Sequence, residues 1–444
     1  MAGLAEILIN YGFRVSGSDL NFNASCQRLS EIGAVVFSGH KKENLGDSVN
    51  LLVYSSAVNF TNPELQEAQR RGTPIIRRAE VLAELMRLSY GVAVAGSHGK
   101  TTTTSMIAAV LEYASLDPTV IIGGQVKSLG TGGKLGKGDF LVAETDESDR
   151  SFLMLKPSIA IVTNIDTEHL SAYSSFAELQ KSFHDFVLAV PFYGLAVLCV
   201  DDPHVRDLAA EYKGRKVTYG LSPEANLRAV NIAHHAMSSD YDVYLEGKKI
   251  LSLTLPMPGL HMVTNSLAAI AIGLELDLKV ETIANALAEF SGVKRRLEVV
   301  AEVEGVTVIN DYGHHPTEIR ATLAALCAGR AERKGSIHVI FQPHRYSRTK
   351  DCFADFIDCF HDCDNLYLTD IYAAGELPVQ GITGKILFNA VSHANKNYVD
   401  KVEETPEVVF SHIKDGDTVL FLGAGSIGVM HEILVNKLRT RKAA

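Results

Sequence analysis

Apolar residues along the chain form short runs that alternate with stretches of helical spacing. In the first 88 residues, three such runs end in polar residues, and the residues between them, for example 63–71, carry a helix-compatible pattern. The runs expected to form strands are Phe13–Asp19, Val35–His40 and Leu51–Ser56. Short strands that alternate with helices are typical of parallel α/β sheets, so this part is predicted to be an α/β domain.

The rest of the chain repeats this alternation in two further segments. In residues 89–294 the predicted strands are 92–95, 139–143 and 159–163, followed by an antiparallel insert around 227–255 and helices at 261–274 and 280–290. In residues 295–444 the predicted strands are 306–310, 336–341, 365–369 and 418–422. We therefore predict three domains, with boundaries at 1–88, 89–294 and 295–444.

Composition narrows the classes of protein that fit this pattern. The 444 residues are 46% hydrophobic and carry a net charge of −10, which argues against a general nucleic-acid binder. No apolar run reaches the length of a membrane span, and no signal-peptide pattern is visible at the N-terminus, so we expect a cytoplasmic protein. The six cysteines are scattered, and Cys359 and Cys363 fit buried core thiols better than a metal site.

The most informative motif is Gly96-Ser97-His98-Gly99-Lys100-Thr101, which joins a predicted strand to a predicted helix. Glycine-loop N–H groups and a helix N-terminus bind phosphate, a lysine adds a positive charge, and a threonine hydroxyl can bind Mg²⁺. Two residues separate the glycines instead of the usual four. We interpret the motif as a shortened ATP-phosphate loop, and the alternative is a glycine turn that caps a helix.

Two polar runs follow the next predicted strands. Glu144–Asp149 is dense in carboxylates, which suit Mg²⁺ beside a phosphate loop, although a solvated acidic loop is the alternative. Thr163–His169 ends in a histidine that could be a second metal ligand or a structural residue. Both runs are predicted to lie at the carboxyl edge of the central sheet.

Polar residues also cluster at strand ends in the outer segments. In the first segment they are Asp19, His40, Ser55 and Ser56, which together predict a small ligand site. In the last segment, Asn310–Glu318 holds two histidines and two acids, and Arg345 and Arg348 could bind a carboxylate or phosphate. The Gly423–Gly428 turn matches a dinucleotide pattern but lacks the later acidic residue, so we interpret it as a helix-packing turn.

These motifs, taken in order, resemble those of the Mur ligases of peptidoglycan synthesis. The His314-His315-Pro316-Thr317-Glu318 run and Asp370–Glu376 are similar to motifs of the alanine-adding members. The resemblance implies a three-domain architecture with a Rossmann-like N-terminal UDP-substrate domain, a P-loop ATPase domain and a Rossmann-like C-terminal amino-acid domain. The strand and glycine-rich loop that open this family's first domain are not seen before Met1, where the sequence begins as a helix.

The resemblance also implies a role for individual residues. Those implied to bind ATP are Gly96, Ser97, His98, Gly99, Lys100, Thr101, Thr102, Asn265, Arg295 and Arg296. Those implied to hold Mg²⁺ are Thr101, Glu144 and His169. Those implied near the uridine are Asp19, His40, Ser55 and Ser56, and those implied to recognise L-alanine are Tyr312, His314, His344, Arg345 and Arg348. Lys100, His169, His314 and Arg345 are the implied catalytic set.

The implied reaction is ATP-dependent ligation of L-alanine to the lactyl carboxylate of UDP-N-acetylmuramate through an acyl phosphate. Developing negative charge would be stabilised by Lys100 and Mg²⁺, and no side-chain nucleophile is required. The alternatives are a ligase that recycles a whole tripeptide, a folylpolyglutamate-type ligase, another P-loop ATPase and a non-catalytic nucleotide-binding protein. Neither a membrane nor a nucleic-acid partner is expected, and the protein is expected to be a monomer or homodimer.

Overall fold

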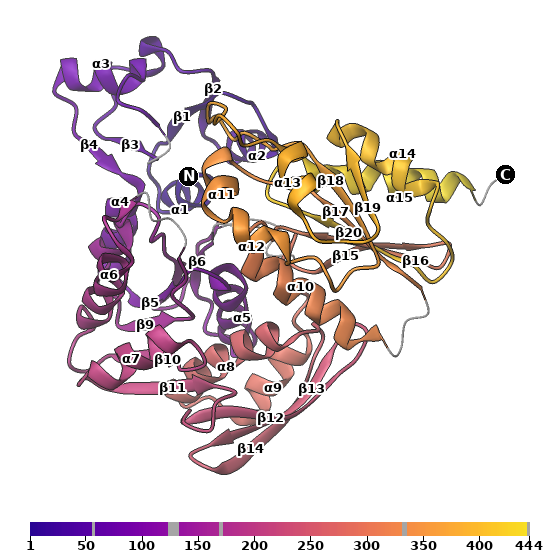
Figure 1. The fold of residues 1–444 in the computed structure, drawn as a ribbon. Coiled ribbons are helices and arrows are strands. Elements are labelled where there is room, and N and C mark those ends of the chain that lie inside the picture. Colours follow the sequence, from indigo (N-terminus) through magenta and orange to yellow (C-terminus); the bar gives the residue numbers. More distant parts are fainter. Residues whose placement is uncertain (56–57, 123–132, 168–171, 331–334, 442–444) are drawn as a thin grey trace. The chain divides into compact units, whose positions relative to one another are not determined.

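A computed structural model describes residues 1–55, 58–122, 133–167, 172–330 and 335–441 (Figure 1). The chain forms two compact units. The first comprises Met1–Val230, Asp242–Ser252 and Thr264–Phe290, and the second comprises Asn231–Tyr241, Leu253–Val263 and Ser291–Ala444.

The first unit opens with two small strand pairs. Its first elements are α1 (Ala2–Asn10), β1 (Ser16–Asp19), α2 (Ala24–Glu31), β2 (Val35–Ser38), β3 (Leu52–Tyr54), α3 (Pro63–Arg71), β4 (Ile75–Arg77) and α4 (Arg78–Arg87). β1 pairs in parallel with β2, and β3 pairs in parallel with β4. The predicted strands are present but shorter than expected. The first begins at Ser16 because the chain turns after α1 through Gly12, whose φ is 91°.

Local sequence explains why α3 begins and ends where it does. Asn62 precedes the helix and accepts a hydrogen bond from the Glu64 N–H, and Pro63 occupies the first turn. Gly72 ends the helix in the left-handed region, with a φ of 72°. Helix α3 therefore presents Glu64 in its first turn, next to the ends of β1 and β2.

The large central sheet holds the middle of the chain. Its strands are β5 (Tyr90–Ala95), β6 (Thr119–Ile121), β7 (Gly133–Lys134), β8 (Phe140–Glu144), β9 (Ile159–Val162), β10 (Leu195–Cys199), β11 (Lys216–Gly220), β12 (Leu227–His234), β13 (Ser239–Leu245) and β14 (Lys248–Leu255). Its helices are α5 (Lys100–Tyr113), α6 (Phe176–Leu188), α7 (Pro203–Glu211), α8 (Leu260–Glu275) and α9 (Val280–Ala288). The strand order is β14-β13-β12-β11-β10-β9-β5-β8-β6-β7.

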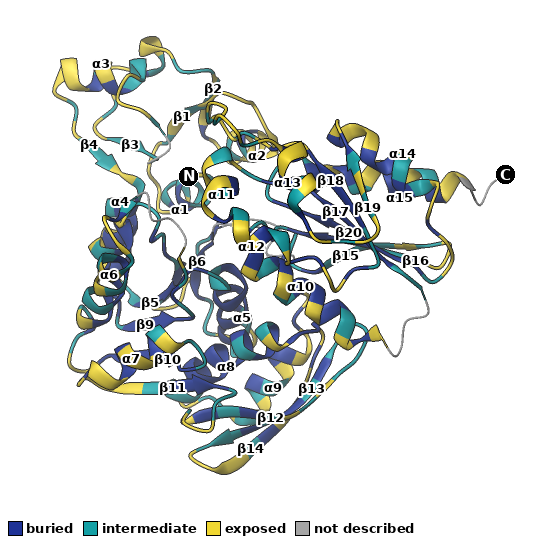
Figure 2. Cartoon of the chain, in the orientation of Figure 1, coloured by how far each residue is buried: buried dark blue, intermediate teal, exposed yellow. Residues whose placement is uncertain are grey.

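The centre of this sheet carries the residues of interest. β5 lies between β8 and β9 and is parallel to both, so the polar residues that follow these three strands meet at one edge. The four residues of β9 and the five of β10 are fully buried, as the dark strands of Figure 2 show. Strands with no exposed face read as continuous apolar runs, which is why the sequence predicted β9. It did not predict β10, although its residues are equally apolar and buried.

The second unit is built on one mixed sheet. Its elements are β15 (Glu298–Val303), β16 (Val306–Asp311), α10 (Pro316–Ala328), β17 (Ile337–Phe341), α11 (Tyr346–Asp351), α12 (Phe353–Ile357), β18 (Asn365–Thr369), α13 (Gly384–Ala390), β19 (Lys396–Val399), α14 (Thr405–Phe410), β20 (Thr418–Leu422) and α15 (Met430–Arg441). The strand order is β15-β16-β20-β17-β18-β19, and only β15 is antiparallel to its neighbour. The expected α/β architecture is thus confirmed for both units.

The segment that carries Cys359 and Cys363 is helical only in its first part. Helical spacing continues through residues 353–363, but α12 ends at Ile357. The apolar side chains still enter the core, since Phe356 and Phe360 pack on Phe341 with ring centroids 5.7 and 5.1 Å apart. Burial raises the pKa of the Cys363 thiol to about 12, which agrees with the core-thiol interpretation.

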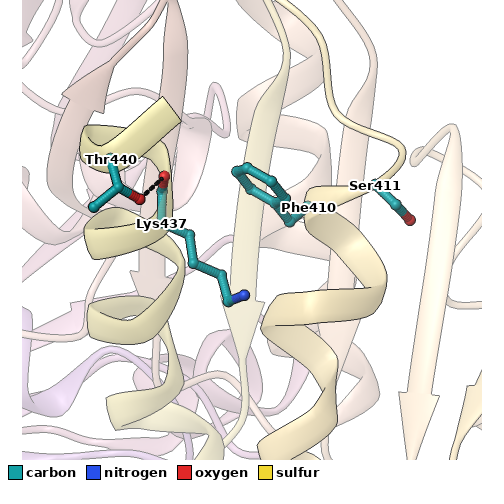
Figure 3. A pocket seen from close by; sticks show the side chains of 4 residues that line it. All are labelled: Phe410, Ser411, Lys437 and Thr440. Carbon is teal, nitrogen blue, oxygen red and sulfur yellow. Dashed lines mark hydrogen bonds between the residues drawn. The ribbon is translucent and has the colours of Figure 1, made fainter. Parts of the chain in front are cut away.

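Two further features of the described residues bear on function. None of their helices combines the length and the apolar character that crossing a bilayer requires. A cavity of about 550 Å³ lies against α14 and α15, lined by Phe410, Ser411, Lys437 and Thr440 (Figure 3). Lys437 forms an ion pair with Glu407 and lies over the Phe410 ring, and the cavity contains none of the residues predicted to bind a substrate.

Candidate active site

The predicted phosphate loop connects β5 to α5. Gly96 and Gly99 have φ angles of 140° and 81°, which residues other than glycine rarely adopt. A Cβ on Gly96 would lie 2.0 Å from Thr163 Oγ1, and one on Gly99 would lie 2.7 Å from Asn265 Oδ1. Both glycines are therefore required by backbone angle and by close packing. Asn265, from α8, lies directly against the loop, and its contact with the nucleotide stays a prediction.

The residues after β9 hold the loop in shape. Asn164 accepts from the His98 N–H at 2.8 Å and donates to the His98 carbonyl at 3.1 Å, while Thr163 donates to that carbonyl at 2.7 Å. Ser97 Oγ accepts from the Asp166 N–H at 2.8 Å. His98 Nε2 lies 2.9 Å from Asp166 Oδ2. Thr163, Asn164 and Asp166 therefore stabilise the conformation of the loop, a role that the sequence did not reveal.

Lys100 is held at the start of α5 by three oxygens. Its ammonium donates to the carbonyls of Gly96 and Ser97 and to Glu147 Oε1, the last at 2.8 Å. Glu147 is only 2% exposed, and burial raises its pKa from 4.5 to about 7 although Lys100 acts in the opposite direction. The lysine therefore lies at a helix N-terminus, where phosphate oxygens are favoured.

The donors for Mg²⁺ come from α5 and β8. Thr101 Oγ1 donates to both carboxylate oxygens of Glu144, at 2.9 and 3.0 Å. A hydroxyl and a carboxylate beside a phosphate loop match the oxygen preference of Mg²⁺, so these two residues fit the ion. Asp146 instead caps its own turn through Ser148, and His169 lies outside the described residues. Of the acidic run, Glu144 and Glu147 contact the loop residues.

In the second unit, an arginine pair surrounds Tyr312. The guanidinium carbons of Arg295 and Arg296 lie 4.8 and 5.2 Å from its ring centroid. Arg295 also donates to the Gly423 carbonyl at 2.5 Å, and a Cβ on Gly428 would lie 2.4 Å from its Cζ. The glycine turn therefore packs on Arg295 and leads into α15, which agrees with its interpretation as a packing turn.

Two histidines lie next to each other beyond β16 and β17. Their ring centroids are 5.7 Å apart, and His344 also stacks on Tyr372 at 5.6 Å. His314 Nδ1 lies 3.0 Å from the Tyr312 carbonyl, so Nδ1 carries the proton and Nε2 is the acceptor of a neutral ring. His344 has the opposite tautomer, because Arg348 donates to its Nδ1 at 3.1 Å.

Electrostatics keep His344 neutral. Its pKa is lowered to about 3, mainly by burial and in addition by His314, Arg348 and Arg345. The ring therefore carries no charge at neutral pH, and its Nε2–H is a donor. Together the two histidines present one acceptor and one donor nitrogen.

Arg345 immediately precedes α11 and has an unusual backbone conformation, with φ 70° and ψ 139°. Glu376 stabilises this turn because it accepts from Ser347 N at 3.0 Å and Ser347 Oγ at 2.6 Å. Glu376 Oε1 also lies 3.9 Å from Arg345 Nη1. The second unit contains all five residues implied to recognise L-alanine, namely Tyr312, His314, His344, Arg345 and Arg348. Their role in recognition stays a prediction.

The predicted uridine residues lie at the ends of β1, β2 and β3. Asp19 is the last residue of β1, and His40 follows β2 by two positions. Ser55 follows β3, whereas Ser56 lies outside the described residues. His40 contacts Ser18 and Glu64, which were not predicted as site residues.

Three Mur ligase domain families match the sequence in chain order. They are described as "Mur ligase family, catalytic domain" at residues 1–90, "Mur ligase middle domain" at 94–273 and "Mur ligase, glutamate ligase domain" at 295–425. The chain belongs to the Mur ligase family.

Individual Mur ligases are similar over nearly the whole chain. A UDP-N-acetylmuramate–L-alanine ligase of Geobacter sp. strain M21 is 49% identical, with 100% of this chain and 96% of the relative covered. The enzyme of the same name from Sorangium cellulosum is 48% identical over 96% of this chain and 92% of the relative. The crystal structure of UDP-N-acetylmuramate-alanine ligase from Thermotoga maritima has a TM-score of 0.85 at 28% identity, covering 99% and 97% of the chains.

Sequence reasoning missed three carboxylates of this Mur ligase that act on other site residues. Glu147 lay inside the acidic run but was not distinguished from its neighbours, and Glu376 lay inside the predicted Asp370–Glu376 motif. Glu64 had no motif around it, although its place in the first turn of a predicted helix could have drawn attention to it. The partners of all three are far away in sequence.

Proposed function

We propose that this protein ligates L-alanine to UDP-N-acetylmuramate with ATP. The observation that carries the proposal is its near full-length similarity, at 46–49% identity, to several proteins named UDP-N-acetylmuramate–L-alanine ligase. The loop with Lys100, Thr101 and Glu144 supports a phosphate- and magnesium-dependent reaction. Since its substrates are a nucleotide sugar, an amino acid and ATP, we expect it to act in the cytoplasm.

The proposed reaction proceeds in two transfers. The lactyl carboxylate oxygen bonds to the terminal phosphorus of ATP while the bond to ADP breaks, which gives an acyl phosphate. The alanine amine then bonds to the acyl carbon, phosphate leaves, and the amine loses a proton. Lys100 and the N-terminus of α5 favour the phosphate charge in both steps, and Mg²⁺ held by Thr101 and Glu144 would neutralise further charge.

The second unit supplies groups that suit an amino acid. Arg345 and Arg348 carry the forked guanidinium that pairs with a carboxylate. His314 has its acceptor nitrogen at Nε2, which suits it to take the proton of the incoming amine, and neutral His344 donates from its own Nε2. We propose that this set recognises L-alanine.

The test measures phosphate release by the purified protein with ATP, Mg²⁺, UDP-N-acetylmuramate and L-alanine, and with each component omitted in turn. Mass spectrometry should find a product heavier than UDP-N-acetylmuramate by one alanyl residue. If the protein instead uses only L-alanyl-γ-D-glutamyl-diaminopimelate, it is the recycling ligase. If ATP hydrolysis needs neither substrate, the proposal is wrong.

A further inference from the structure

Glu64 lies at the centre of a polar network at the ends of β1 and β2. Its Oε2 accepts from Ser18 Oγ at 2.8 Å, and its Oε1 accepts from Asn44 Nδ2 at 2.7 Å and from Lys41 N at 3.3 Å. The Glu64 side chain is only 17% exposed. Such a carboxylate, at the first turn of α3, fixes the orientation of every donor that faces it.

The network also determines which ring nitrogen of His40 carries a proton. Ser18 Oγ lies 2.8 Å from His40 Nδ1 as well as 2.8 Å from Glu64 Oε2. A serine hydroxyl has one proton, and the ionised carboxylate has none, so this proton lies toward Glu64. His40 Nδ1 must then donate to Ser18. In a neutral ring, Nε2 is consequently the acceptor.

His40 Nε2 is available to a ligand. The His40 side chain is 21% exposed, and no protein partner of this nitrogen is found in the described part of the chain. The ring follows a parallel strand at its carboxyl end, where α/β sheets bind ligands. A ligand that meets this nitrogen needs an N–H group.

We propose that Glu64 is a positioning residue for base recognition, acting through Ser18 to make His40 Nε2 an acceptor for the N3–H of uracil. The proposal rests on the proposed function, which supplies a uridine nucleotide as substrate. Cytosine has an unprotonated N3, so the same nitrogen faces a second acceptor and the pair is unfavourable. Glu64 thereby selects the nucleotide base without touching it.

Substitution of Glu64 by glutamine reverses this chain of donors. The Lys41 N–H and Asn44 amide both point at Oε1, so the amide oxygen of the introduced side chain takes that place and its NH₂ faces Ser18. Ser18 then accepts from the amide and donates to His40 Nδ1. The ring proton moves to Nε2, which suits cytosine N3 and opposes uracil N3–H.

The test measures dissociation constants for UDP, CDP and N3-methyl-UDP by calorimetry. The wild type should bind UDP about tenfold more tightly than either analogue. In Glu64→Gln the UDP-to-CDP preference should fall by about tenfold, and ¹⁵N NMR should find the His40 proton on Nε2. Glu67→Gln is the matched control, because Glu67 lies on the same helix and pairs with Arg70 and Arg71 instead.

Kinetics separate this role from a merely structural one. In Glu64→Gln the KM for UDP-N-acetylmuramate should rise while kcat stays unchanged, and Ser18→Ala should reduce base preference as well. If Glu64→Gln keeps the wild-type UDP-to-CDP ratio, the proposal is wrong even where the wild type ligates alanine. If the wild type ligates no alanine but base preference depends on Glu64, the proposed function fails and the base-recognition role stands.

Discussion

The Lys100–Glu147 pair predicts an unusual pH dependence of stability. Glu147 is buried to 2% exposure, and its pKa is raised from 4.5 to about 7. Because the folded-state pKa lies above the unfolded one, the folded protein binds the proton more tightly. Glu147 therefore stabilises the fold below pH 4.5, and this contribution is lost as pH rises through about 7.

The magnitude follows from the two pKa values. A change from 4.5 to about 7 corresponds to roughly 3 kcal/mol of stability lost between pH 4.5 and pH 8. Glu147→Gln removes the titration and keeps the shape of the side chain. The free energy of unfolding of this variant should thus rise relative to the wild type by about 3 kcal/mol across this range.

Urea unfolding of both proteins at pH 5, 6, 7 and 8 measures this difference. Infrared difference spectra between the wild type and Glu147→Gln report directly when the carboxyl group ionises. Glu178→Gln is the control. The pKa of Glu178 is lowered to about 2, so this carboxylate keeps its charge between pH 5 and 8. A difference between Glu147→Gln and wild type that stays constant from pH 5 to 8 would refute the reasoning.

Three further predictions concern the loop and the second unit. Lys100→Met should lower alanine-dependent ADP release at least a hundredfold, because the phosphate charge loses its ammonium partner, while Lys181→Met on the exposed face of α6 should leave it unchanged. Gly96→Ala should lower the unfolding temperature and ATP affinity more than Gly247→Ala lowers the unfolding temperature. Both have positive φ, but the new Cβ clashes only at Gly96, so equal losses of stability would contradict the packing argument. The His344 ring should titrate near pH 3 by NMR. Its contribution to stability should be lost as pH falls from 6.5 toward 3. A titration near pH 6.5 would contradict the buried environment described for this ring.

The sequence predicted those parts of the site that short stretches of chain determine. The phosphate loop needed a strand, two glycines and a helix within 90–113, and all are found there. Buried strands such as β9 and β20 were found because both of their faces are apolar. The short outer strands of the first unit were placed less accurately, since exposed residues such as Phe13 extend their apolar pattern beyond the paired backbone.

The sequence could not show which polar residues form hydrogen bonds with each other. The amides of Ser97 and His98 and the carbonyl of His98 are bound by residues more than 60 positions later. Periodicity and local propensity contain no information on such pairs, because they arise only when parallel strands bring their carboxyl ends together. The same limit explains why the arginine and histidine motifs were recognised while the tautomers of His314 and His344 were not.

The three missed carboxylates have one physical task in common. Glu147 holds Lys100, Glu64 orients Ser18, and Glu376 holds Ser347, across 47, 46 and 29 residues of chain respectively. Lys100 is itself proposed to bind a substrate. Ser18 contacts His40, and Ser347 lies between Arg345 and Arg348, all three of which are also proposed to bind a substrate. A long or rotatable side chain loses conformational freedom when it binds, and a carboxylate that restricts it beforehand reduces that cost. Substitution of these acids should therefore act mainly on KM for the substrate that each neighbouring group meets, and the affected substrate should differ among the three: ATP for Glu147, the nucleotide sugar for Glu64 and alanine for Glu376.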